Sequence, residues 1–163
     1  MAGSMPTERF YTIQHVNAWR VAQSTGILTG NPTFIDPHFI RPYQWIRKQM
    51  QLHHRMGKHS TGYPVWAWDF VPTPEMYTTP CVLIEFNAHL ENAFITLFEE
   101  WHIILNATET EHQNEQTLIG NTILFKWEEI IVPLASGPTP ADQLLQYSFE
   151  KITIDQVVST TLL

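Results

Sequence analysis

The sequence is poor in cysteine, in charged residues and in long apolar runs. Its single cysteine, Cys81, excludes an internal disulfide framework and a multi-cysteine zinc site, and it favours a reducing compartment such as the cytoplasm. Only 15% of the 163 residues are charged and 44% are hydrophobic, which argues against a disordered chain. No apolar run approaches the roughly 18 residues of a membrane span. Ile130–Val132, for example, stops at Pro133. We therefore expect a folded, soluble, cytoplasmic protein.

Several motifs that would name an activity are missing as well. The chain has no GxGxxG, no GxxxxGK(S/T), no HExxH and no GxSxG sequence. Its net charge of −7 argues against a surface that binds nucleic acid or anionic membrane as a whole. The length predicts one domain, and the first five residues look like a cloning scar, so we expect a single domain over 6–163.

Apolar periodicity predicts a mixture of strands and helices. We predict strands over 10–14, 63–68, 81–86, 145–149 and 157–158. We predict helices from Asn17 to the stop at Gly26, over 43–56 and over 90–105, the last with the clearest helical period. Residues 122–127 fit either a strand or the start of a short helix. The order lacks a strict βαβ rhythm, which favours an α+β domain with a central, largely antiparallel sheet and about three flanking helices.

Positive charge is concentrated in one acid-free window, residues 37–68. The window holds five cations, Arg41, Arg47, Lys48, Arg55 and Lys58, so the rest of the chain carries about −12. Such a window attracts phosphate groups, although a solvated helix face is an equally good explanation. Arg41, Arg47, Arg55 and Lys58 should form a positive region beside the main cleft. The adjacent His53 and His54 would point about 100° apart on a helix, which argues against a shared metal ion.

Two polar residues interrupt apolar elements. Glu85 lies in an otherwise apolar strand, where a carboxylate either forms an ion pair or serves a site with a raised pKa. His102 shares a predicted helix face with Glu99 and Asn106, which suits acid–base work or a histidine satisfied by a neighbouring carboxylate. Alternation places Trp66 and Trp68 on one strand face, either in the core or as a stacking platform for a base or nicotinamide ring.

These elements together resemble a small bacterial family known only as a domain of unknown function. The resemblance is carried by short motifs, Tyr11–Gln14 with Ala18-Trp19, Tyr43–Trp45 with Gln49-Met50, Tyr63–Trp68, Val82–Phe86, Trp101-His102 with Leu105-Asn106, and Gln146–Glu150. It implies a cytoplasmic bacterial or phage protein, and it implies no activity. Six residues match the family pattern, Trp66, Trp68, Glu85, Trp101, His102 and Asn106.

The segment from Tyr11 to Asn17, with the helix and Gly26–Leu28 after it, is similar to the first motif of small ADP-ribosyltransferases, including toxins that modify DNA. This resemblance implies that the first strand holds the nicotinamide end of NAD, that a basic residue meets the phosphates and that an aromatic strand forms a stacking wall. The residues at the nicotinamide end would be Thr12, Gln14 and Asn17, and the basic residue would be Arg41 or Arg47. The stacking wall would be formed by Tyr63, Trp66 and Trp68. In that family a late Gln-x-Glu strand supplies the catalytic carboxylate. Here Ser148 stands at the Glu position, so the catalytic carboxylate would have to come from Glu150 or Glu85 instead.

The sequence therefore favours an ADP-ribosyltransferase-like protein that binds NAD or a related nucleotide and, if it is an enzyme, transfers ADP-ribose to a macromolecule. The candidate catalytic residues are Glu85, His102 and Glu150, and no metal is expected. The alternative is a non-enzymatic acidic binding or inhibitor protein that engages a basic protein partner. Convergence of Trp66, Trp68 and Glu85 on one concave pocket would favour the first reading, and an exposed flat aromatic patch would favour the second.

Overall fold

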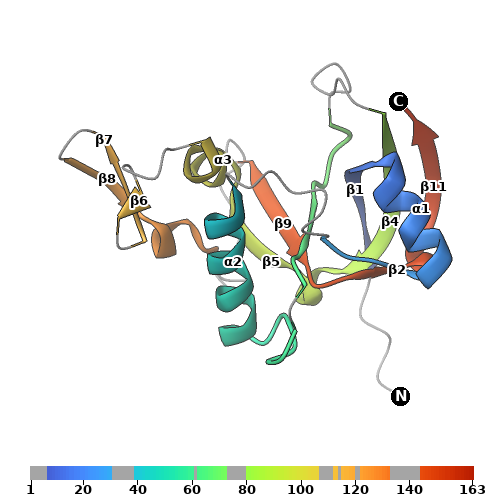
Figure 1. Cartoon of the computed structure of the whole chain (residues 1–163), viewed down its shortest axis with the longest axis horizontal. Helices are drawn as coiled ribbons and strands as arrows, with labels where there is room; N and C mark the ends of the chain where they lie inside the picture. Colours follow the sequence, from blue (N-terminus) through green and yellow to red (C-terminus); the bar gives the residue numbers. More distant parts are fainter. Residues whose placement is uncertain are drawn as a thin grey trace. The chain divides into compact units, whose positions relative to one another are not determined.

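The computed structural model describes residues 7–30, 39–60, 62–72, 80–106, 112–113, 115–119, 122–132 and 144–163 (Figure 1). The chain divides into two compact units. The first comprises the chain up to Phe94 together with Tyr147–Leu163, and the second comprises Ile95–Gln146. Residues 1–5, which the sequence suggests are a cloning scar, lie outside the described residues. No helix in the described part of the chain is long and apolar enough to cross a membrane.

A three-stranded antiparallel sheet organises the first unit. Its middle strand is β4 (Cys81–His89), which pairs with β1 (Thr7–His15) on one side and β11 (Val157–Leu162) on the other. Figure 1 shows the three strands side by side. Alternate residues of β1 and β4, such as Phe10 and Phe86, are buried, while those between them are half-buried or exposed. The sheet therefore has one core face and one partly open face.

The core face is built around an aromatic cluster. The fully buried ring of Phe10 lies 5.0 Å from both Tyr147 and Phe149, centroid to centroid, and 5.9 Å from Phe86. Rings at such separations add about 0.5–1.5 kcal/mol per pair to the free energy of burial. These four residues come from three strands, β1, β4 and β9 (Leu145–Phe149), so the cluster joins segments far apart in the sequence.

Helix α1 (Val16–Thr25) follows β1 directly and packs against β1 and β4. Its first turn is capped by the Nδ1 atom of His15, which accepts a hydrogen bond from the Asn17 N–H at 3.1 Å. It ends at Gly26, whose φ of +83° lies in the left-handed region that favours glycine. The next strand, β2 (Ile27–Leu28), pairs with β10 (Ile152–Thr153).

Helix α2 (Ile40–Leu52) precedes the short strand β3 (Val65–Ala67), which pairs with β9 through Tyr147–Phe149. Trp68 then forms a bridge to Tyr11 on β1. Two 3-10 turns complete the first unit, η4 (Leu90–Asn92) after β4 and η6 (Ile154–Gln156) before β11.

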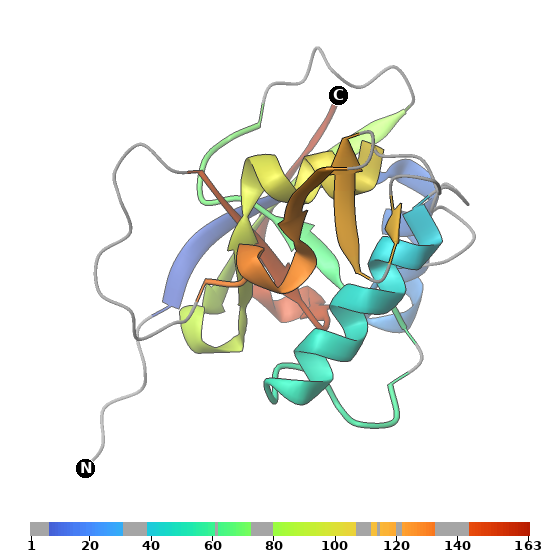
Figure 2. The same cartoon turned by 90° about the vertical axis from the view of Figure 1, so that its left-hand side faces the viewer.

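The second unit holds a helix and a hairpin. Strand β5 (Phe94–Leu97) leads into α3 (Phe98–Asn106), followed by β6 (His112–Gln113), β7 (Gln116–Ile119), β8 (Thr122–Lys126) and the 3-10 turn η5 (Trp127–Ile130). Figure 2 shows the antiparallel β7–β8 hairpin and the η5 turn that follows it. The buried Trp127 donates from Nε1 to the Thr117 hydroxyl at 2.9 Å, which fixes η5 to the hairpin.

The predicted α+β class is confirmed, with three α-helices and antiparallel pairing in the described residues. The helix predicted over 90–105 is wrong in its first half, which forms η4 and β5. Residues 93–96 are all buried, and Thr96 of β5 forms a β-bridge with Ile131. Pairing with a segment distant in the sequence therefore overrides the helical period. The helix predicted over 43–56 is α2, three residues earlier at its start and four shorter at its end. Residues 122–127 are a strand that enters a 3-10 turn.

Candidate functional site

The first unit contains an open cleft of about 530 Å³. The turn after α2 forms one wall, the end of β4 and η4 contribute Ala88 and Asn92, and the segment from β9 to η6 forms the rest. Its lining residues are His54, Arg55, Met56, Gly57, Lys58, Ala88, Asn92, Phe149, Glu150, Lys151, Thr153 and Gln156. The lining thus combines polar and cationic side chains with the buried apolar residues Met56, Ala88 and Phe149.

Three cations line the cleft, Arg55, Lys58 and Lys151, against one carboxylate, that of Glu150. Lys58 and Lys151 are exposed, and within the part of the chain that the structure describes none of the three forms an ion pair. Arg55 donates from Nη1 to the His53 carbonyl oxygen at 3.2 Å. The cleft therefore presents positive charge to solvent within a chain whose net charge is −7.

The turn that carries Gly57 and Lys58 is held in place from two sides. The Gln51 side-chain amide at the end of α2 donates to the carbonyl oxygens of Gly57, Lys58 and Ser60, at 3.1, 3.3 and 3.2 Å. From the other wall, Glu150 Oε1 accepts a hydrogen bond from the Gly57 N–H at 3.1 Å. The Glu150 carboxylate thus occupies the Gly57 N–H, a backbone donor that borders the cleft.

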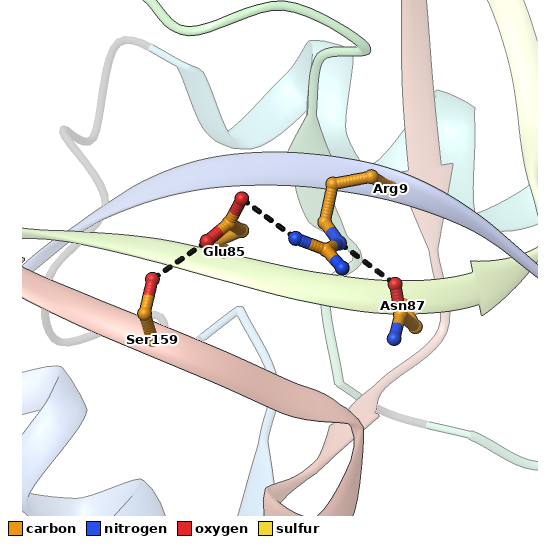
Figure 3. A network of polar contacts seen from close by, with 4 residues as sticks. All are labelled: Arg9, Glu85, Asn87 and Ser159. Atoms are coloured by element: carbon orange, nitrogen blue, oxygen red, sulfur yellow. Dashed lines mark hydrogen bonds and ion pairs between the residues drawn. The ribbon is translucent and has the colours of Figure 1, made fainter.

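Glu85 belongs to a polar network on the partly open face of the sheet (Figure 3). Its Oε1 atom pairs with Arg9 Nη1 at 2.8 Å, and its Oε2 atom accepts from the Ser159 hydroxyl at 2.7 Å. Arg9 also donates from Nε to Asn87 Oδ1 at 2.8 Å. The hydrogen bonds from Ser159 and then Arg9 lower the pKa of the Glu85 carboxyl. Of the two predicted alternatives the structure has the ion pair, and the lowered pKa contradicts the raised pKa of the other alternative.

The network reaches the cleft through the backbone of β4. The carbonyl oxygen of Asn87 accepts from Gln156 Nε2 at 3.0 Å, and Gln156 Oε1 accepts from the Thr153 N–H at 2.8 Å. Gln156 and Thr153 line the cleft, and Glu85 does not. Glu85 therefore stabilises the sheet that carries one wall of the cleft.

The aromatic strand predicted over 63–68 packs against α2, the helix that carries Arg41, Arg47 and Lys48. Tyr43 of α2 stacks on Trp66 of β3, with ring centroids 4.8 Å apart at 13°, and Arg47 lies 4.9 Å above the Tyr63 ring. Burial raises the pKa of Tyr43. One face of Trp66 is thus covered by Tyr43, and Trp68 is only 7% exposed in the core. None of these aromatic residues lines the cleft.

The remaining predicted residues occupy separate places. Thr12 is buried on β1 and accepts from the Gln14 side chain at 3.0 Å, while Asn17 Oδ1 accepts from Arg20 at 3.2 Å. Arg41 is exposed on α2. His102 lies on α3 in the second unit, where Nδ1 donates to the Phe98 carbonyl oxygen at 2.8 Å. His102 is thus satisfied by a backbone carbonyl of its own helix rather than by the neighbouring carboxylate that the sequence suggested.

The structure brings together only part of the predicted site. Glu150 lines the cleft, and so do Arg55 and Lys58 from the acid-free window, whereas Arg41 and Arg47 do not. Lys151, Thr153 and Gln156 also line the cleft and were not predicted from the sequence. Their one signal was their position directly after the predicted 145–149 strand, beside Glu150. No group of three or more His, Cys, Asp or Glu residues suited to a metal ion occurs in the described ranges.

Comparison with curated proteins and with solved structures gives no match. One domain family, described as "Domain of unknown function (DUF3841)", matches residues 9–119. The matched region contains most of β1 and all of α2, β3, β4 and α3, and with them the 54–58 wall of the cleft. Because the match covers more than half of the 163 residues, the chain belongs to the DUF3841 family.

Proposed function

We propose that this protein binds a phosphate-bearing nucleotide, of which NAD is one example, in the cleft between residues 54–58 and 149–156. One observation carries the proposal. Arg55, Lys58 and Lys151 converge on one open cleft, and none forms an ion pair with a described residue. Cations that no carboxylate neutralises lower the energy of a bound anion and speed its capture.

The size and lining of the cleft suit a nucleotide. Its volume of about 530 Å³ lies within the range of small-molecule sites. Arg55 can hold a phosphate with paired N–H groups, and Lys58 and Lys151 act as mobile point charges. The remaining polar lining, Asn92, Thr153 and Gln156, supplies amide and hydroxyl groups that suit sugar hydroxyls and base edges.

Transfer of ADP-ribose is the reaction that the sequence resemblance implies, and Glu150 is the carboxylate that supports it. A carboxylate beside the bound ribose would stabilise the positive charge that develops as nicotinamide leaves. Ser148, at the position where those enzymes have Glu, is fully buried, and its hydroxyl has no hydrogen-bond partner among the described residues. Glu150, two residues further along, is half-buried and faces the cleft.

Calorimetric titration with ADP and with NAD tests the binding proposal. We expect saturable binding that Lys58→Glu weakens by about tenfold or more, because a charge-assisted hydrogen bond contributes roughly 1.5–3 kcal/mol. Lys48→Glu is the matched control, since Lys48 is exposed on α2 and does not line the cleft. A bound nucleotide should also raise the melting temperature of the wild type.

Two outcomes would contradict the proposal. One is an equal loss of affinity in Lys58→Glu and Lys48→Glu, which would assign binding to the general charge of the acid-free window. The other is the absence of heat and of thermal stabilisation at millimolar nucleotide.

A further inference from the structure

Strand β11 forms an open edge of the three-stranded sheet. At the opposite edge, β1 is covered by Trp68, whose N–H donates to the Tyr11 carbonyl at 2.9 Å while the Tyr11 N–H donates to the Trp68 carbonyl at 2.8 Å. Nothing in the described chain pairs with the outer side of β11. Among the described residues the sheet is therefore covered at one edge and unpaired at the other.

The backbone register shows which groups point outward. The Leu163 N–H donates to the Cys81 carbonyl oxygen at 3.0 Å, so Leu163 faces β4. Backbone groups in an antiparallel strand alternate in direction, so Thr161 and Ser159 also face β4. Thr160 and Leu162 then direct their N–H and C=O groups away from the sheet, where no described residue accepts or donates.

The edge lacks two of the usual devices that discourage pairing, charged side chains and proline, along the regular part of the strand from Ser159 onward. Residues 157–163 include no charged residue and no proline, and the β-bulge lies at the start of the strand, between Val157 and Ser159. Two apolar side chains stand open on it, Val158 at 48% exposure and Leu162 at 71%. An uncharged strand also lets two molecules that each carry −7 approach here without opposed like charges.

We propose that β11 pairs with β11 of a second copy of this chain, antiparallel across a two-fold axis at Thr160. In this register Thr160 exchanges both backbone hydrogen bonds with Thr160 of the second copy. Val158 and Leu162 lie two residues to either side of Thr160. Position 158 of each copy therefore lies opposite Leu162 of the other, as a closed isologous interface requires. The two three-stranded sheets join into one continuous sheet.

Sedimentation equilibrium tests this dimer. The wild type should dimerise, and Thr160→Lys should weaken dimerisation by about tenfold or more, because it places like charges face to face on the two-fold axis. Thr161→Lys is the matched control. It adds the same charge at an exposed position one residue along, with its side chain on the other face and its backbone turned toward β4. It should leave the dimer largely intact.

Amide hydrogen exchange adds a local readout. The N–H groups of Thr160 and Leu162 should become protected as protein concentration rises, and Thr160→Lys should abolish that concentration dependence while its melting temperature as a monomer stays unchanged. A wild type that remains monomeric at millimolar concentration would overturn the proposal. So would a dimer that Thr160→Lys and Thr161→Lys affect equally, which would place the interface elsewhere.

Discussion

Replacing Glu150 with glutamine separates the charge of this side chain from its hydrogen bond. In the structure Glu150 Oε1 accepts from the Gly57 N–H at 3.1 Å, beside Lys58 and Lys151. The glutamine oxygen can accept the same hydrogen bond, so Glu150→Gln removes one negative charge and keeps the turn in place. A phosphate in the cleft then loses a like-charged neighbour and faces three uncompensated cations.

The size of the effect follows from Coulomb's law. Two charges about 4 Å apart interact by about 1 kcal/mol in water and by about 4 kcal/mol at an effective dielectric constant near 20. The cleft is open to solvent, so the lower value applies, and ADP should bind about fivefold more tightly to Glu150→Gln than to the wild type. Isothermal titration at low salt, where screening is weak, measures this ratio.

The ratio should shrink as salt is added, because the open cleft is screened. If Glu150 is also the carboxylate of ADP-ribose transfer, the same variant binds more tightly and loses activity. Affinity in Glu150→Gln equal to or below that of the wild type would contradict this prediction, since it would mean that the carboxylate lies away from the bound phosphates.

Three further predictions concern the fold that holds the cleft. Phe10→Ala should cost about 3–5 kcal/mol in a urea melt, because it empties the centre of the aromatic core, and a loss below about 1 kcal/mol would contradict that packing. Gly30→Ala should cost about 1–3 kcal/mol, because an added Cβ would lie 2.7 Å from the Tyr63 carbonyl oxygen and break the hydrogen bond there. Gly62→Ala, which meets nothing closer than 4.0 Å, is its control. The lowered pKa of Glu85 means that its contacts stabilise the fold above about pH 4.3 and are lost as pH falls through the folded-state pKa. The stability difference between wild type and Glu85→Gln should therefore vanish in acid, and a difference that persists at pH 2 would contradict the assignment.

Local patterns were sufficient to predict the first two helices and five of the described strands, β1, β3, β4, β9 and β11. The β-branched and aromatic run around Tyr11 forms β1, and Gly26 ends α1 as its position suggested. The pattern failed at 90–97, where Leu90, Phe94 and Leu97 fit a helical period but form a 3-10 turn and a strand. A short apolar run is compatible with both states, and its partner, Ile131, lies 35 residues after Thr96.

The candidate site was harder to predict because it depends on long-range contacts. The acid-free window indicated Arg55 and Lys58, but sequence gives no means to separate them from Arg47, which α2 directs onto the Tyr63 ring. Glu150 and Lys151 reach the cleft because β9 and β10 bring the end of the chain back to the turn after α2, as the bond from Gly57 to Glu150 shows. Glu85 drew attention as a lone carboxylate in an apolar strand, and its partners come from β1 and β11.

An NMR titration of the ¹⁵N-labelled protein with ADP tests nucleotide binding in this cleft without relying on a variant, because it locates the ligand by residue. We predict that the amide signals of 54–58 and 150–153 move together and saturate, with Gly57 among the largest changes because its N–H borders the cleft and bonds to Glu150. Changes concentrated at Tyr63 and Trp66, or no saturable change at millimolar ADP, would contradict the assignment of this cleft as the nucleotide site.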